Sequence, residues 1–300
     1  MSILTVCKLT KKYNSYTVVD KISFQLEANK CIALIGPNGA GKTTTLRMLA
    51  GLIKQTSGTI NFLNTGQKDF RSFIGYLPQH PVFYNWMSGL EYLIYCAKLT
   101  LIDRKEAKSR AEELLEKVGL KDAKNKQIGN YSGGMKQRLG IAQAIIHQPK
   151  LVILDEPVSA LDPIGRREVL TLMEELKKEM TILFSTHILN DADEISDELL
   201  LLHDGKIVEA GSMELLRKKY QTAKIELEFD DSAEKYENSL KGLNSVNATY
   251  IKKRALHVTV SDMDIARMEI LKTATENAWP LTNFTVNRAS LEDMFMKAVN

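Results

Sequence analysis

The 300-residue sequence predicts an α/β fold with a mainly parallel central sheet, followed by a small α+β domain. The apolar runs Cys31–Ile35, Leu151–Leu154 and Thr181–Thr186 are short, as in parallel strands that are buried inside a sheet. After about residue 220 the pattern changes: apolar and charged residues alternate from Ile225 to Phe229, as in a strand with one exposed face. We therefore expect two domains, at residues 1–220 and 221–300.

Composition and charge set the broad class of the protein. With 44% hydrophobic and 26% charged residues, the chain has the content of an ordinary globular protein with a sizeable core. No apolar run approaches the roughly 20 residues that cross a bilayer, and the N-terminus does not have the pattern of a secretory signal. Three widely separated cysteines favour a reduced, cytoplasmic protein. A net charge of +3 is too small to indicate a nucleic-acid-binding surface.

A glycine-rich segment follows the first apolar run and has the pattern G-x-x-x-x-G-K-[ST]. Apolar residues at helical spacing come after it, so the order of strand, glycine loop and helix is that of a phosphate-binding loop. In such a loop Lys42 reaches the β- and γ-phosphates, and the Thr43 hydroxyl binds Mg²⁺. The expected phosphate-binding residues are Gly36, Pro37, Asn38, Gly39, Ala40, Gly41, Lys42, Thr43 and Thr44.

Two carboxylates follow the apolar run Leu151–Leu154. Ligands bind at the carboxyl end of parallel strands, where Asp155 suits a direct or water-mediated role at Mg²⁺. Glu156 is placed to polarise a water molecule for attack on the γ-phosphate. The alternative is a solvated acidic turn, and Lys42 upstream favours the catalytic interpretation.

The segment Ser132-Gly133-Gly134 precedes a helical run. By itself it predicts only a helix N-cap with a flexible approach. Beside a phosphate loop and a carboxylate pair, it indicates one half of a nucleotide site whose other half comes from a second molecule.

Over roughly residues 1–220, these motifs resemble the nucleotide-binding subunits of ATP-binding cassette (ABC) proteins. The family signature Leu-Ser-Gly-Gly-Gln is present here with Tyr131 in place of Leu and Met135 in place of Gln, while Ser132, Gly133 and Gly134 are kept. The resemblance implies a P-loop NTPase cassette that binds ATP and Mg²⁺ and hydrolyses ATP. It also implies a dimer, formed with a second copy or with a similar cassette, in which Ser132 and Gly134 of one chain meet the γ-phosphate held by the other.

The resemblance assigns further residues. Tyr13 would stack on adenine, with Tyr16 as the substitute and a strand-edge tyrosine as the alternative interpretation. Gln79 matches the glutamine that contacts Mg²⁺, Asp162 lies in the segment called the D-loop, and His187 matches the histidine that binds the γ-phosphate. The expected catalytic residues are Lys42, Gln79, Glu156 and His187, and the expected metal ligands are Thr43, Gln79 and Asp155.

Residues of about 85–145 are expected to form a helical subdomain. A capping box at Ser88 and Glu91 opens one predicted helix, and Asp103 opens another that ends near Gly119. The resemblance implies that this subdomain docks on a separate transmembrane permease. The aromatic residues Phe83, Tyr84 and Trp86 would help to line the docking groove; simple packing beneath the helices is the alternative.

The tail predicts the order βαββαβα of a small ferredoxin-like domain. Its expected helices lie near residues 231–240 and 263–276, a strand lies near 281–287, and a last helix carries Leu291, Met294, Phe295 and Ala298. The tail has no second phosphate loop, so we expect an accessory domain that pairs or regulates the cassettes. Residues 290–295 resemble the tail of drug- and antibiotic-exporter cassettes.

The sequence therefore favours the ATP-hydrolysing subunit of a membrane exporter for a drug, antibiotic, lipid or similar compound. Such a subunit would be cytoplasmic and held on the inner face of the cell membrane by its permease, with no nucleic-acid partner. A soluble ABC ATPase acting on ribosomes or DNA is the alternative, although such proteins usually carry two cassettes or a long coiled-coil insertion. A P-loop kinase or GTPase is a third possibility, against which the signature and His187 argue.

Overall fold

The computed structural model describes residues 2–62, 69–220 and 224–287 together with Leu291, Met294, Phe295 and Ala298. The chain forms two compact units, Met1–Met213 and Glu214–Ala298. Helix α7 (Met213–Tyr220) lies at the start of the second unit, so the division comes before the boundary expected at residue 220.

A six-stranded sheet with the strand order β5-β6-β7-β3-β8-β9 forms the centre of the first unit. The first five strands in this order are parallel, and β9 pairs with β8 in the antiparallel direction. Every residue of β3, β6 and β7 is buried, which confirms the strands predicted from the apolar runs. The strands are β3 (Cys31–Ile35), β5 (Ile74–Leu77), β6 (Leu151–Asp155), β7 (Thr181–Thr186), β8 (Glu198–His203) and β9 (Lys206–Ser212).

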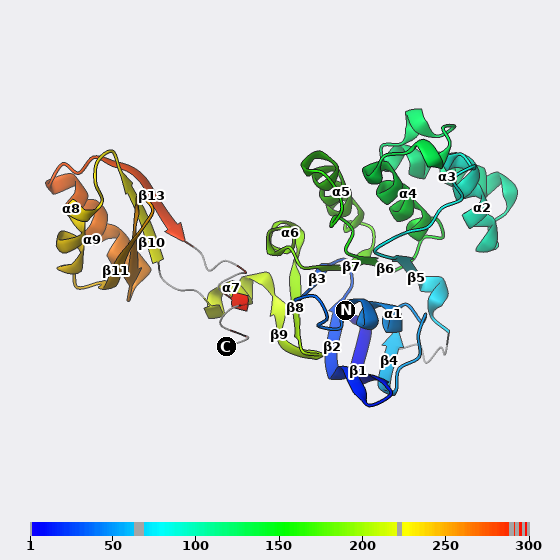
Figure 1. Cartoon of the computed structure of the whole chain (residues 1–300), viewed down its shortest axis with the longest axis horizontal. Coiled ribbons are helices and arrows are strands. Elements are labelled where there is room, and N and C mark those ends of the chain that lie inside the picture. The colour runs from blue at the N-terminus through cyan, green and yellow to red at the C-terminus, as the bar shows by residue number, and fades with distance from the viewer. Residues whose placement is uncertain are drawn as a thin grey trace. The chain divides into compact units, whose positions relative to one another are not determined.

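A second, antiparallel sheet of the same unit has the order β2-β1-β4. Figure 1 shows this sheet and α1 on one face of the six-stranded sheet, with α4, α5 and α6 on the other face. Leucine, isoleucine and phenylalanine side chains fill the space between the two sheets and α1. The elements are β1 (Ser2–Tyr13), β2 (Tyr16–Glu27), β4 (Ser57–Phe62), α1 (Lys42–Leu49), α4 (Gly133–Ile145), α5 (Pro163–Leu176) and α6 (Leu189–Ile195).

The helical subdomain is built from α2 (Gly89–Leu99), α3 (Arg104–Lys117) and α4. Its predicted capping box is confirmed: Ser88 Oγ accepts a hydrogen bond from Glu91 N at 3.2 Å, and Glu91 Oε2 accepts one from Ser88 N at 2.8 Å. Asp103 caps α3, as expected. The described residues of this unit also form the short 3₁₀ helices η1 (Arg71–Phe73), η2 (Lys121–Ala123) and η3 (Ile128–Asn130).

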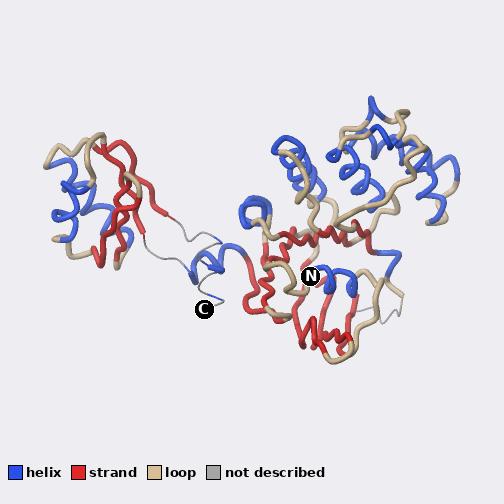
Figure 2. Tube along the Cα trace, in the orientation of Figure 1, coloured by secondary structure: helices blue, strands red, loops and turns tan. Residues whose placement is uncertain are grey.

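The second unit contains a four-stranded antiparallel sheet with the order β11-β12-β10-β13. Helices α8 and α9 cover one face of this sheet, which is the predicted ferredoxin-like arrangement (Figures 1 and 2). The elements are β10 (Lys224–Phe229), α8 (Glu234–Lys241), β11 (Val246–Lys252), β12 (Ala255–Val260), α9 (Met263–Glu276) and β13 (Leu281–Asn287). The four residues that define the predicted last helix are helical, and the residues between them lie outside the described part of the chain.

One glycine sets how closely α4 approaches the central sheet. Gly75 lies in β5, and a Cβ atom there would be 2.0 Å from the carbonyl oxygen of Ala144 in α4. Gly75→Ala should therefore lower the free energy of unfolding of the first unit by about 1–3 kcal/mol, because the backbone has to move to make room. Chemical denaturation measures this change. The exposed residue Ser72 offers the control Ser72→Ala, expected to change stability by less than about 0.5 kcal/mol; equal stability of both variants would contradict the close approach.

Candidate active site

The glycine-rich segment forms the turn from β3 into the N-terminus of α1. Gly41 precedes the helix at φ 103°, and a Cβ atom there would lie 2.8 Å from the carbonyl oxygen of Val18, so both the conformation and the space require glycine. Lys42 is only 6% exposed. Its Nζ donates hydrogen bonds to the carbonyl oxygens of Gly36 at 2.8 Å and Pro37 at 3.2 Å. The turn thus holds the ammonium group at the carboxyl end of β3.

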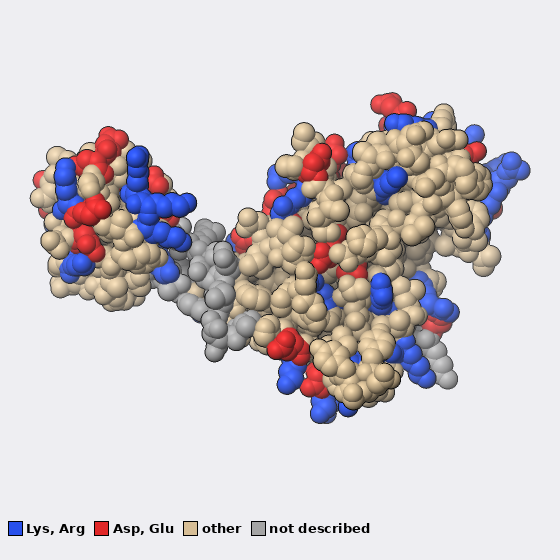
Figure 3. All heavy atoms as spheres, in the orientation of Figure 1, with Lys and Arg blue, Asp and Glu red and all other residues tan. Residues whose placement is uncertain are grey.

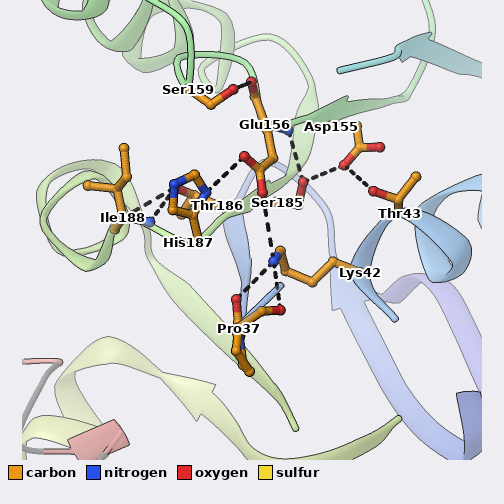
Figure 4. A network of polar contacts seen from close by, with 11 residues as sticks. Pro37, Lys42, Thr43, Asp155, Glu156, Ser159, Ser185, Thr186, His187 and Ile188 are labelled. Atoms are coloured by element: carbon orange, nitrogen blue, oxygen red, sulfur yellow. Dashed lines mark hydrogen bonds and ion pairs between the residues drawn. The ribbon is translucent and has the colours of Figure 1, made fainter. Parts of the chain in front are cut away.

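Asp155 is the last residue of β6 and is fully buried. Its Oδ1 accepts a hydrogen bond from Thr43 Oγ1 at 3.1 Å, so the end of β6 and the start of α1 are joined (Figure 4). Its Oδ2 is buried without a hydrogen-bond partner among the described residues. A buried carboxylate oxygen without a partner, beside a hydroxyl, fits the oxygen ligands that Mg²⁺ prefers.

Glu156 follows directly, with a positive φ of 49° that is uncommon for a residue other than glycine. Its Oε1 lies 3.7 Å from Lys42 Nζ, and its Oε2 lies 2.8 Å from Nδ1 of His187. Figure 4 shows the carboxylate between these two side chains. Strained backbone of this kind is concentrated at functional sites, where it aims a side chain.

Ser185 connects the two carboxylates and was missed by the sequence analysis. The parallel register of β6 and β7 pairs it with Asp155. Its Oγ donates to Asp155 Oδ1 at 2.7 Å and accepts from Glu156 N at 2.9 Å. The sequence carries no signal for this role, because Ser185 lies in an otherwise apolar run and only the strand register brings it beside Asp155.

A cavity of about 360 Å³ opens at this cluster. Burial lowers the pKa of Lys42, and the carboxylates of Glu156 and Asp155 oppose that shift. The cavity is therefore a place where an anion meets a poorly solvated ammonium group. Its lining comprises Val18, Asn38, Gly39, Gly41, Lys42, Thr43, Thr44, Gln79 and Glu156.

Tyr13 and Tyr16 pair with each other at the tip of the β1–β2 hairpin. Both are solvent exposed, and neither lines the cavity. Lys11 Nζ lies 4.9 Å from the centroid of the Tyr13 ring. The stacking role of Tyr13 stays a prediction.

The signature segment lies at the N-terminus of α4. Ser132 is the N-cap, and its Oγ accepts a hydrogen bond from Met135 N at 3.2 Å. Ser132 and Gly133 are exposed and do not line the cavity of their own chain. Tyr131 is buried and its hydroxyl donates to the carbonyl oxygen of Ala123 at 2.8 Å, so this departure from the family signature ties the segment to η2.

Asp162 caps α5, with Oδ1 accepting from Gly165 N at 2.7 Å. Asp162 also lies outside the cavity lining. Four residues further on, Arg166 Nε donates to Asp191 Oδ1 of α6 at 2.6 Å, an interaction that the sequence analysis did not anticipate. Asp191 is fully buried, and burial raises its pKa while Arg166 opposes the shift. This pair joins the helix after Asp162 to the helix after His187.

Comparisons with known proteins agree with this geometry. The family described as "ABC transporter" matches residues 19–159, and the family described as "ATP-binding protein DrrA1-3-like, C-terminal domain" matches residues 211–299. The uncharacterized ABC transporter ATP-binding protein YxlF of Bacillus subtilis is 44% identical over 299 residues, covering 99% of this chain and 100% of that protein. The chain belongs to the ABC transporter family.

Two further similar proteins are a named transport subunit and a subunit of known structure. The bacitracin transport ATP-binding protein BcrA of Bacillus licheniformis is 35% identical over 318 residues, covering 99% of this chain and 97% of BcrA. A solved structure of an ATP-binding subunit of an ABC transporter is 32% identical with a TM-score of 0.64, covering 73% of this chain and 93% of that one. As an ABC transporter subunit the chain binds ATP and is an ATPase, and these similarities favour transport over action on ribosomes or DNA. In the described ranges, no helix combines the length and apolarity needed to span a bilayer.

Ser185 stabilises the turn after β6 through its hydrogen bonds to Asp155 and to the Glu156 amide. Ser185→Ala should lower the free energy of unfolding by about 1–3 kcal/mol, because it removes a partner from both Asp155 and the Glu156 amide inside the protein. Chemical denaturation of the protein without nucleotide measures the effect. Ser159→Ala is the matched control, since Ser159 Oγ contacts the same turn only through the Glu156 carbonyl oxygen at 3.2 Å and is less buried. A Ser185→Ala variant no less stable than this control would refute the bridging role.

Proposed function

We propose that this chain is the ATP-hydrolysing subunit of a membrane exporter for a drug, antibiotic, lipid or similar compound. ATP hydrolysis is supported by the position of Glu156, which lies between Lys42 and His187 and lines the cavity at the glycine-rich turn. Export is supported by the similarity to BcrA and to the linearmycin resistance ATP-binding protein LnrL of Bacillus subtilis, which is 29% identical over 296 residues.

In this proposal the glycine-rich turn binds the phosphates of ATP. The N-terminus of α1 favours negative charge, and backbone N–H groups of residues 38–44 would surround the phosphates. Lys42 Nζ exchanges its carbonyl partners for β- and γ-phosphate oxygens. Because Lys42 is buried, its attraction for the phosphates is screened little by water.

Asp155 and Thr43, with Gln79 at the cavity wall, would hold Mg²⁺. The unpartnered Oδ2 of Asp155 is the observation that supports this donor set. When bound, the ion supplies neutralisation of phosphate charge. The protein orients the oxygen ligands. Ser185 does this for Asp155, through its hydrogen bond to Oδ1.

Glu156 is the proposed general base. Its carboxylate faces the cavity and would accept a proton from the water that attacks the γ-phosphate. Nδ1 of His187 lies within hydrogen-bond distance of Glu156, which fixes the direction of the carboxylate. The other ring nitrogen of His187, Nε2, would hydrogen-bond to the γ-phosphate.

We infer that a second chain completes the site. Ser132, Gly133 and Gly134 lie at a helix N-terminus, which favours an anion, yet they are absent from the cavity of their own chain. In a dimer with a second copy or a similar cassette, they would meet the γ-phosphate held by Lys42 of the other chain, with Asp162 nearby and Tyr13 on the adenine. ATP would then join the two cassettes, and loss of the γ-phosphate would let them separate.

The helical subdomain would dock on a separate transmembrane permease, which would hold the chain at the inner face of the cell membrane. Tyr84 and Trp86 support this surface, because both are exposed and their ring centroids lie 6.1 Å apart. Phe83 instead packs edge-on against Tyr92 at 5.3 Å and is partly buried, which favours the packing interpretation for this residue. The second unit would pair or regulate the cassettes.

Glu156→Gln is expected to keep ATP binding and to reduce turnover by about 10²–10⁴-fold, because an amide cannot accept the proton from water. The variant should also accumulate an ATP-dependent dimer. Phosphate release measures turnover, and analytical ultracentrifugation measures the dimer.

Glu174→Gln, an exposed change on α5, is the control and should behave like the wild type. Hydrolysis by Glu156→Gln at the wild-type rate would overturn the assignment of the base. An inactive variant that stays monomeric in ATP would instead refute the closed dimer.

A further inference from the structure

The turn between α2 and α3 presents two leucines to solvent. Leu99 is 66% exposed and Leu101 is 94% exposed. Tyr95, one turn earlier than Leu99 on α2, is also exposed and shares its side of the helix. The buried face of α2 is formed by other residues, namely Gly89, Tyr92, Leu93 and Ala97.

The backbone of this turn does not require a leucine. Leu101 N donates to the Lys98 carbonyl at 3.1 Å and Ile102 N donates to the Ala97 carbonyl at 3.2 Å, which is the Schellman pattern that ends many helices. Leu101 has φ 65°, at the position where glycine is usual because a Cβ atom is strained there. Ile102 supplies the inward apolar contact, against the cluster of Ala97 and Ala107. The outward leucine therefore costs backbone strain and contributes no packing.

Basic side chains surround the two leucines. Lys98, Arg104, Lys105 and Lys108 are all exposed, and no ion pair or side-chain hydrogen bond is found for them within the described residues. The nearby acidic groups are engaged locally: Asp103 caps α3, and Glu106 pairs with Arg110. Figure 3 shows basic side chains projecting from the end of the subdomain that carries α2 and α3. Basic groups therefore outnumber acidic groups around an apolar tip.

We propose that this turn is a membrane-contact site of the chain, in which Leu99 and Leu101 enter the headgroup region of an anionic bilayer. Protruding apolar side chains within a set of lysines and arginines are the combination that binds anionic lipid surfaces, because burial of the apolar groups adds to attraction of the cations. The long stems of Lys98 and Arg104 can lie along the apolar boundary while their charges reach the lipid phosphates. Leu101 protrudes almost completely, which suits insertion into a fluid layer. Contact with the bilayer would be separate from attachment through a permease.

The test uses the purified full chain without any permease and measures co-sedimentation with vesicles. We expect binding to vesicles of phosphatidylcholine with phosphatidylglycerol, weak binding to phosphatidylcholine alone, and loss of binding as salt rises. Leu99→Ser with Leu101→Ser should weaken binding by about tenfold or more. Lys98→Gln and Arg104→Gln should each weaken it by about fivefold. Leu52→Ser, at an exposed leucine elsewhere in the first unit, is the matched control and should bind like the wild type.

The variant Leu101→Gly distinguishes loss of membrane contact from loss of folding as the cause of weaker vesicle binding. Glycine relieves the strain at a positive φ, so the midpoint of thermal unfolding should not fall, while vesicle binding should weaken. ATPase activity of every variant in vesicle-free buffer should equal that of the wild type.

Three results would each overturn the proposal: no binding of the wild type to anionic vesicles, equal binding to neutral ones, or binding that the leucine substitutions leave unchanged. Crosslinking from Leu101→Cys only to a protein of the transporter, with no dependence on anionic lipid, would assign the turn to a protein partner instead.

Discussion

The ammonium group of Lys42 is buried, and a buried charge must be paired and hydrogen bonded to be tolerated. Its partners come from two distant parts of the chain: the carbonyl oxygens of Gly36 and Pro37 before α1, and the carboxylate of Glu156 after β6. The contact between Lys42 and Glu156 therefore joins the turns that follow β3 and β6, two strands that have β7 between them in the sheet. Removing one member of such a group leaves an uncompensated charge and costs about 3–5 kcal/mol. These partners stabilise the ammonium group in the protein without nucleotide. A phosphate of bound ATP could replace them as the partner of Lys42.

Much of the nucleotide site could be predicted from the sequence, because its residues lie at strand ends and in glycine turns whose local patterns are distinctive. Lys42, Thr43, Gln79 and Glu156 line one cavity, as expected from their positions in the sequence. His187 was expected at the same site, and its contact with Glu156 is visible only in the structure. Three features could not be predicted in this way. Ser185 joins Asp155 only through the register of two parallel strands. The pair of Arg166 and Asp191 depends on how two helices pack, and local sequence does not encode that.

The third feature is the turn at Leu101. When a helix ends at a residue in the left-handed conformation, that residue is usually glycine. Leu101 has this conformation, and a leucine does not indicate a helix end in the sequence. Tyr131 shows the opposite situation: it is visible in the sequence as a departure from the family signature, and its reason is visible only in the structure, where its hydroxyl reaches the Ala123 carbonyl. The departures of Tyr131 and Met135 thus leave the backbone of the signature intact, since Met135 contributes its N–H to Ser132.

In the proposed dimer, the two halves of each ATP site lie on different chains. The most direct measurement is ATPase activity after mixing a Lys42→Ala chain with a Ser132→Arg chain, each of which should be inactive alone. In a mixed dimer one site would contain both substitutions and the other would contain neither, so activity should return. Mixing the Lys42→Ala chain with a chain that carries both substitutions leaves no intact site and should restore nothing. Failure of the first mixture to regain activity, with mixed dimers present, would contradict the shared site.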